Sequence, residues 1–202
     1  GGGGTREPCG HRVAPQVPPA GARPAQDHVL NLRSFIREIP DFPKPGIGFK
    51  DITPLFLDPA ALEHAGALLA RYAVERDVDF VVSAEARGFV LGGVIASKAQ
   101  AGFIPARKPG KLPAETSSVE YALEYGIDAL HVHADALSGG ARVLVHDDLL
   151  ATGGTAAAMC ELVENAGAEV VGCGFVIELA FLGGRERLAG RDVRSLVTYD
   201  EA

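Results

Sequence analysis

The stretch that decides the fold is VLVHDDLLATGGT, residues 143–155. Its apolar start belongs to the run 142–146, which is typical of a strand buried inside a sheet. Two adjacent carboxylates then leave the strand, and two glycines lead into a helix predicted over 156–165. A buried strand that is followed by a turn and a helix is the repeating unit of a parallel α/β sheet.

The same alternation continues on both sides of this stretch. Asp58 with Pro59 marks the start of a further helix, because Asp is a good N-cap and Pro suits the first turn. Ligands of parallel sheets bind beyond the carboxyl ends of the strands, so we expect the site in the loops that follow strands. The patterns predict helices over 28–39 and 88–100, and strands over 78–83, 103–106, 169–179 and 193–199.

The composition is that of one globular domain. The chain has 202 residues, 47% of them hydrophobic, and a formal net charge of −7, which argues against binding nucleic acid through a basic face. The stretch closest to a membrane span, 170–184, is short and contains Glu178. The three cysteines, Cys9, Cys160 and Cys173, are widely spaced and suggest neither a disulfide framework nor a zinc site. We therefore expect a cytoplasmic protein without membrane or nucleic-acid partners.

The first residues differ from the rest of the chain. Residues 1–27 are rich in Gly, Pro and Ala, carry scattered charge and show no apolar period. We expect them to form a disordered N-terminal extension rather than a signal peptide, because prolines interrupt any apolar run. Residues 28–202 are expected to form a single domain.

Residues 151–155, which follow the strand predicted over 142–146, have the features of a binding loop for one phosphate monoester. Gly153 and Gly154 let backbone N–H groups approach an anion, and the start of the following helix favours negative charge. Thr152 and Thr155 can add hydroxyl donors.

Asp147 and Asp148 need a different partner, because carboxylates repel phosphate. A vicinal diol suits them, since a carboxylate accepts hydrogen bonds from both hydroxyls. A phosphate and a diol on one loop describe a ribose 5-phosphate. The alternative is that the two carboxylates merely cap a turn, which the glycines close.

Segment 143–155 resembles the diphosphoribose-binding signature of type I phosphoribosyltransferases. The resemblance covers roughly residues 28–200 and is closest to the adenine phosphoribosyltransferases of that family. It implies a Rossmann-like parallel sheet flanked by helices, with a small N-terminal hood (28–57) and a mobile lid (107–126). The further stretches that carry it are 39–55, 85–89, 107–113, 121–126 and 178–185.

The resemblance also implies a reaction, a cofactor and an assembly. Adenine and 5-phosphoribosyl 1-diphosphate would be converted to AMP and diphosphate in purine salvage. Mg²⁺ would be carried by the diphosphate substrate rather than held directly by the protein. The assembly implied is a homodimer.

Most of the residue roles that the resemblance implies concern the phosphoribosyl group and the diphosphate. Asp147 and Asp148 would hold the ribose hydroxyls and offset positive charge that grows on the sugar. For Glu85 and Arg87, whose implied role is to bind the diphosphate, the alternative is an ion pair at the surface. The 5′-phosphate would be bound by Ala151, Thr152, Gly153, Gly154 and Thr155. The diphosphate would be bound by Glu85, Ala86, Arg87, Arg107, Lys108 and Lys111, with Arg87 also catalytic beside the base.

The remaining roles concern the base and the lid. Phe49 and Leu149 would sandwich the purine, with backbone groups around Gly48 reading its edge. Relatives often carry a branched apolar residue where Gly48 stands, so the pocket wall is looser here, and the alternative for Phe49 is a core position. In the lid, Glu124 would handle the purine proton as a catalytic residue, and Tyr125 would pack against the ribose or the leaving group.

Two other functions compete with this one. A 6-oxopurine phosphoribosyltransferase would keep the fold and change the base, although the hood motif argues against it. A regulator that senses phosphoribosyl diphosphate without catalysis would need a DNA-binding module, which residues 1–27 are too short to form. His131, His133, His146 and Cys160 are expected to be structural.

Overall fold

The computed structural model describes residues 30–122 and 127–201. The predicted disordered extension, 1–27, lies outside the described residues. So do Glu124 and Tyr125, for which the predicted lid roles stay predictions.

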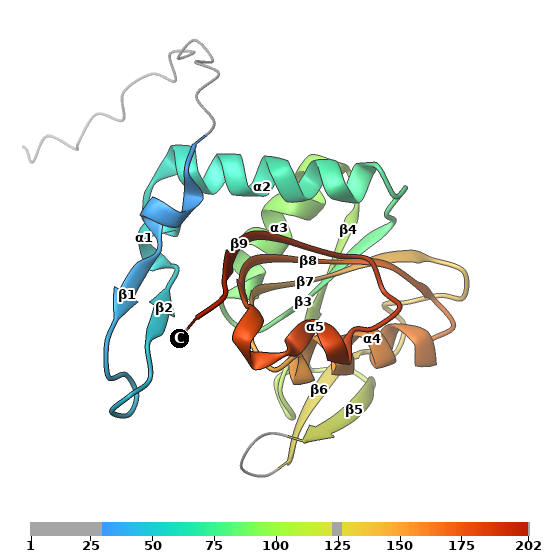
Figure 1. The fold of residues 1–202 in the computed structure, drawn as a ribbon. Helices are drawn as coiled ribbons and strands as arrows, with labels where there is room; N and C mark the ends of the chain where they lie inside the picture. The colour runs from blue at the N-terminus through green and yellow to red at the C-terminus, as the bar shows by residue number, and fades with distance from the viewer. Residues whose placement is uncertain (1–29, 123–126, 202) are drawn as a thin grey trace, which may run out of the picture.

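Five parallel strands form the centre of the fold, in the order β4-β3-β7-β8-β9 (Figure 1). Every strand predicted from the sequence is present, and the parallel sheet is confirmed. The strands are β3 (Phe80–Ala84), β4 (Gly102–Ala106), β7 (Arg142–Leu150), β8 (Glu169–Leu179) and β9 (Val193–Tyr199). The helices around them are α2 (Pro59–Val74), α3 (Gly88–Ala99), α4 (Gly154–Asn165), η2 (Ala180–Leu182) and α5 (Gly184–Arg187).

Both faces of the sheet are covered, because successive residues of a strand point to opposite sides. Val143 and Val145 pack in one hydrophobic core with α4. Leu144 packs in a second core, on the other face, with α2 and α3. This double burial explains why the middle of β7 is apolar at consecutive positions.

Strand β7 is longer than predicted. It continues through Asp147 and Asp148 to Leu150, because β8 runs alongside it for the same distance. Asp147 pairs with Phe175 and Leu150 pairs with Glu178. The two carboxylates therefore stand on a strand and not in a loop, and the turn begins only at Ala151.

Residues 30–39, the described part of the helix predicted over 28–39, do not form that helix. A short 3-10 helix, η1 (Leu32–Phe35), is followed by strand β1 (Arg37–Ile39), which pairs antiparallel with β2 (Phe49–Asp51). Arg37 Nη2 lies 2.7 Å from Asp51 Oδ2 across this pair, a contact that local spacing does not reveal. With α1 (Thr53–Leu57), these elements make up the segment predicted as the hood.

A hairpin of two antiparallel strands stands beside the main sheet. Its strands are β5 (Thr116–Ala122) and β6 (Ile127–His133). Backbone hydrogen bonds join Arg107 to His131 in both directions, with N···O distances of 2.9 and 2.7 Å. The predicted lid (107–126) contains only the first of these strands, so its predicted end divides one hairpin.

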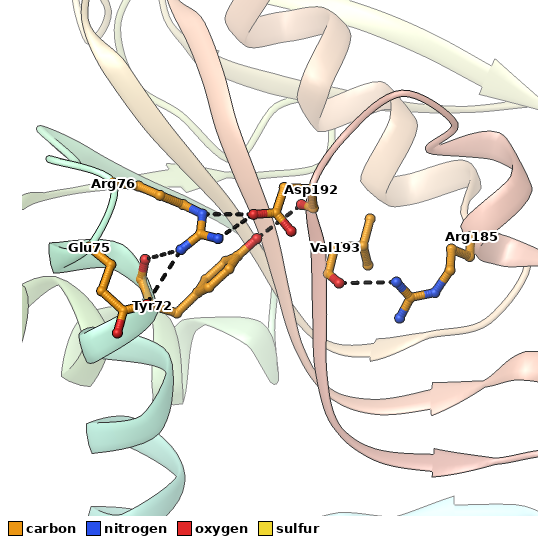
Figure 2. A network of polar contacts seen from close by, with 6 residues as sticks. All are labelled: Tyr72, Glu75, Arg76, Arg185, Asp192 and Val193. Carbon is orange, nitrogen blue, oxygen red and sulfur yellow. Dashed lines mark hydrogen bonds and ion pairs between the residues drawn. The ribbon is translucent and has the colours of Figure 1, made fainter.

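A polar network holds the start of the edge strand β9 to α2 (Figure 2). Arg76 forms an ion pair with Asp192 and donates a 3.0 Å hydrogen bond to the carbonyl oxygen of Tyr72. The Tyr72 hydroxyl donates to the Asp192 carbonyl oxygen at 3.0 Å. From the other side, Arg185 donates to the Val193 carbonyl oxygen at 3.0 Å. Strand β9 is thus fixed between α2 and α5.

Both cysteines of the described residues are buried, which confirms the prediction made for Cys160. Cys160 and Cys173 are free thiols in the core, with their sulfur atoms 3.8 Å apart. Within 30–122 and 127–201, none of the helices combines the length and apolar character that a membrane crossing requires.

His146 is a buried strand residue, as expected. Its Nδ1 lies 2.8 Å from the carbonyl oxygen of Gly174, so Nδ1 carries the proton of a neutral imidazole. Burial lowers the pKa of His146 to about 4. Between that pKa and the ordinary value of about 6.5, the unfolded chain binds a proton that the folded chain does not. Acidification through this range therefore destabilises the fold.

We predict that His146→Leu removes this contribution to acid sensitivity. Between pH 7 and pH 5 the free energy of unfolding of the wild type should fall by about 2 kcal/mol more than that of the variant. Urea denaturation of both proteins at the two pH values measures the difference. An equal pH dependence in the two proteins would show that His146 does not titrate in this way.

Candidate active site

The carboxyl ends of β3, β4 and β7 open on one cleft of about 320 Å³. Parallel strands end at the same edge of a sheet, which is why residues far apart in sequence meet there. Seven predicted site residues line it: Glu85, Ala86, Arg87, Lys108, Asp147, Asp148 and Thr155. Four residues that we did not predict also line it: Ala84, Tyr121, Asp128 and Leu130.

The acidic pair of β7 is tied to Arg87. Asp147 Oδ1 accepts the N–H of Asp148 at 2.9 Å, and Arg87 Nε lies 3.0 Å from Asp148 Oδ2. Burial raises the pKa of Asp147 well above its ordinary range, and the charge of Asp148 adds to the effect. Burial also raises the pKa of Asp148, although Arg87 opposes this. A ligand that brings hydroxyl donors or positive charge would therefore stabilise the ionised pair.

The predicted phosphate loop is held in shape by a backbone contact with α5. Gly153 has a φ of +79° and is the N-cap of α4. A Cβ atom on Gly184 would lie 2.1 Å from the carbonyl oxygen of Ala151, and one on Gly153 would lie 2.5 Å from that of Gly184. Only glycines allow the two backbones to approach so closely. The amide groups at the start of α4 have the dipole that favours an anion.

Helix α5 is itself anchored to the sheet. Arg185 contacts the buried carboxylate of Glu178 through two nitrogens, with Nε–Oε1 at 2.9 Å and Nη2–Oε2 at 2.5 Å. The Ser195 hydroxyl donates to the same carboxylate at 2.6 Å. Arg185 and Ser195 lower the pKa of Glu178 and so keep it ionised. Because Glu178 on β8 pairs with Leu150 on β7, the strand that anchors α5 lies directly beside the strand that enters the phosphate loop.

Glu85 organises the cationic segment that follows β4. Its Oε1 accepts the N–H of Lys108 at 2.7 Å, and its Oε2 lies 2.9 Å from both Nε and Nη2 of Arg107. Burial raises the pKa of Glu85, but these contacts outweigh it, and the net pKa is lowered. The alternative of a Glu85–Arg87 surface pair is wrong, because Arg87 pairs with Asp148. Arg107 also donates to the carbonyl oxygen of Lys111 at 3.2 Å, while the Lys111 side chain is exposed.

The predicted base-binding residues lie beside the cleft without lining it. Phe49 is half-buried and belongs to neither core, so the alternative of a core position is wrong. Its ring meets that of Phe42 edge-on, with centroids 5.1 Å apart, and the guanidinium carbon of Arg87 lies 5.7 Å from its centroid. Arg87 therefore links the hood to the acidic pair. Gly48 on the hood and Leu149 on β7 are also half-buried.

Sequence reasoning missed Tyr121 and Asp128 as cleft residues. They are direct cross-strand partners in the hairpin, and Asp128 Oδ2 lies 2.9 Å from Lys108 Nζ. Lys108 lowers the pKa of Asp128, so the carboxylate is charged. The available signal was the hairpin itself: in an antiparallel pair centred on residues 123–126, positions 121 and 128 face each other.

The comparison with protein families accounts for this arrangement. The family model for the phosphoribosyl transferase domain matches residues 55–194. This match spans β3 to β8 and therefore every strand that opens on the cleft. The chain belongs to the phosphoribosyltransferase family.

Individual relatives place the chain within that family, among the adenine phosphoribosyltransferases. It is 57% identical over 171 residues to the adenine phosphoribosyltransferase of Rubrobacter xylanophilus, covering 84% of this chain and 92% of the relative. The crystal structure of the enzyme from Thermoanaerobacter pseudethanolicus superposes with a TM-score of 0.80 at 50% identity, covering 83% of this chain and 98% of that one. The Saccharomyces cerevisiae enzyme, complexed with adenine and an imino-altritol bisphosphate, has a TM-score of 0.76 at 39% identity and covers 82% of this chain and 96% of its own.

We predict that Gly184→Ala weakens the binding of ribose 5-phosphate about tenfold or more. The added methyl group would collide with the Ala151 carbonyl and force the phosphate loop to move. Isothermal titration calorimetry with ribose 5-phosphate measures the effect. Gly93→Ala is the matched control, because a Cβ at this helical position has nothing within 4 Å. Unchanged affinity in a folded Gly184→Ala variant would contradict the role of the contact.

Proposed function

We propose that this protein transfers the phosphoribosyl group of 5-phosphoribosyl 1-diphosphate to adenine, forming AMP and diphosphate in purine salvage. One observation supports the proposal most: a single cleft is lined by the acidic pair, by Thr155 in the first turn of α4, and by Arg87 and Lys108, which follow β3 and β4. Each of these groups suits a different part of the same substrate. High identity to adenine phosphoribosyltransferases over more than four fifths of the chain supports the choice of base.

The acidic pair and the phosphate loop would hold the ribose 5-phosphate. Asp147 and Asp148 accept hydrogen bonds from the ribose hydroxyls, and Ala151, Thr152, Gly153, Gly154 and Thr155 receive the 5′-phosphate. Glycosyl transfer passes through a state in which the sugar carries positive charge. Burial disfavours the charged form of this carboxylate pair, so the pair is stabilised most when positive charge develops on the sugar. Stabilisation that is greater in the transition state than in the ground state is the condition for catalysis.

The leaving diphosphate would be received by cations of two loops. Arg87 and Arg107 are already oriented by Asp148 and Glu85, so these two cations need little reorganisation when the anion arrives. Lys108, which is paired with Asp128, is the third cation at the cleft. Glu85 and Ala86 line the same cleft. The Glu85 carboxylate acts by holding Arg107 and Lys108, and Lys111 adds positive charge nearby.

Mg²⁺ fits this site as an ion that enters on the diphosphate. The ion is usually held by phosphate oxygens, waters and one or two carboxylates. Asp147 and Asp148 are hard oxygen donors of this type in the cleft, and they can reach such an ion through water. When bound, Mg²⁺ would neutralise part of the charge on the leaving group.

The purine would lie between Phe49 and Leu149, with backbone groups at Gly48 reading its edge. Arg87 approaches this place from the acidic pair and is suited to the base side of the reaction. Glu124 would take up the purine proton and Tyr125 would cover the reacting centre from the lid (107–126). The hood (28–57) and the lid then enclose the base from two sides and exclude water.

We further propose a homodimer in the cytoplasm. The proposal of a dimer rests on the family resemblance. The free, buried thiols of Cys160 and Cys173 are consistent with a reducing compartment. Analytical ultracentrifugation tests the dimer directly.

We predict that adenine, 5-phosphoribosyl 1-diphosphate and Mg²⁺ yield AMP and diphosphate in equal amounts, measured by chromatography. With hypoxanthine, guanine and xanthine present at the same concentration, adenine should be preferred about 100-fold or more. Preference for a 6-oxopurine would overturn the choice of base. Absence of any nucleotide product would overturn the proposed reaction.

We predict that replacing Asp147 and Asp148 together by Asn lowers kcat/KM about 100-fold or more. The fold should be retained, because the change removes charges that burial disfavours. Initial rates and thermal unfolding of the variant measure the two effects separately. Asp135→Asn, an exposed site after β6, is the control for loss of charge. A double variant as active as the wild type would refute the assigned role.

A further inference from the structure

The side chain of Lys108 is held by a carboxylate from the hairpin. Its Nζ lies 2.9 Å from Asp128 Oδ2, and both residues line the cleft. Asp128 Oδ1 accepts the N–H of Ala129 at 2.9 Å, which turns the other oxygen toward Lys108. The side chain of Asp128 is 18% exposed and that of Lys108 is 56% exposed. The ammonium group is therefore solvated and free to change partners, whereas the carboxylate is held in place.

Asp128 is the second residue of β6 and lines the cleft. Its cross-strand partner is Tyr121, whose hydroxyl lies 3.5 Å from the same Oδ2. One further pair, Ala122 with Ile127, separates them from residues 123–126. The ion pair thus joins the segment after β4, with which the predicted lid (107–126) begins, to strand β6 of the hairpin.

The partner of Lys108 differs in kind from those of the other cations. Arg87 and Arg107 pair with Asp148 and Glu85, which stand on or directly after strands of the central sheet. The backbone of Lys108 is also fixed by Glu85. Only the side chain of Lys108, among these three, is bound by the hairpin. An ammonium on a flexible stem exchanges partners more readily than a two-pronged guanidinium.

We propose that Asp128 is a positioning residue that occupies Lys108 until the diphosphate group displaces it. This inference rests on the proposed function and deepens it. In the free protein, Asp128 keeps the ammonium in the cleft and neutralises its charge. On binding, the diphosphate takes over the ammonium, and Lys108 keeps an anionic partner in both states. Asp128 therefore weakens diphosphate binding and favours release of the product.

The test is the affinity for magnesium diphosphate, measured by calorimetry on the wild type and Asp128→Asn. Without the competing carboxylate, the variant should bind magnesium diphosphate about threefold to tenfold more tightly. The KM for 5-phosphoribosyl 1-diphosphate should fall by a similar factor, with no increase in kcat. Asp128→Glu should restore values near those of the wild type. Asp135→Asn, which removes the same charge at an exposed position, should change neither constant.

A double-mutant cycle with Lys108→Met separates competition from a structural effect. Without the ammonium group, adding Asp128→Asn should leave the affinity for magnesium diphosphate unchanged. An equal gain in both backgrounds, or no gain or a loss in the single variant, would overturn the proposal. If Asp128→Asn does not fold, Asp128→Ser takes its place in the cycle. Absence of AMP formation by the wild type would instead overturn the proposed function, because diphosphate binding is measured without turnover.

Discussion

The structure depends most on the parallel pairing of β7 with β8, which continues past the acidic pair to Leu150 and Glu178. This extension keeps Asp147 and Asp148 on a rigid strand and starts the phosphate loop at a defined point. Glu178, at the end of the same pairing, holds Arg185 and through it α5. The backbone of Gly184 then shapes the loop. The sugar end and the phosphate end of the site are thus supported by one pair of strands.

Charge compensation is the second organising constraint of the cleft. Four carboxylates, Glu85, Asp128, Asp147 and Asp148, share it with three cations that line or adjoin it. Arg87, Arg107 and Lys108 are each paired with a carboxylate, at N···O distances of 3.0, 2.9 and 2.9 Å. This pairing stabilises the cations before a ligand arrives and orients them toward it. The same pairing sets a competition that an incoming polyanion must win.

Sequence reasoning predicted the central sheet well, because its signals are local. Runs such as Val143 to Val145 are apolar at consecutive positions, and this pattern has one common explanation in a sheet that is covered on both faces. The prediction of a helix over 28–39 was wrong because the deciding contact there is not local. Its apolar spacing fitted a helix, but pairing of Arg37–Ile39 with Phe49–Asp51 offered the backbone partners from another segment. Tertiary pairing of this kind overrides weak local preference.

The sequence by itself determined the order of the strands and helices of the central sheet, the acidic pair and the glycine-rich turn, because these depend on residue types that follow one another along the chain. It also carried the resemblance that identified the family. Only the tertiary structure decided that Asp128 meets Lys108, that Glu85 serves Arg107 rather than Arg87, and that Gly184 touches the phosphate loop. Each of these contacts joins residues that are far apart in the sequence. The sequence offers each charged side chain several possible partners of opposite charge, and only packing in three dimensions selects one of them.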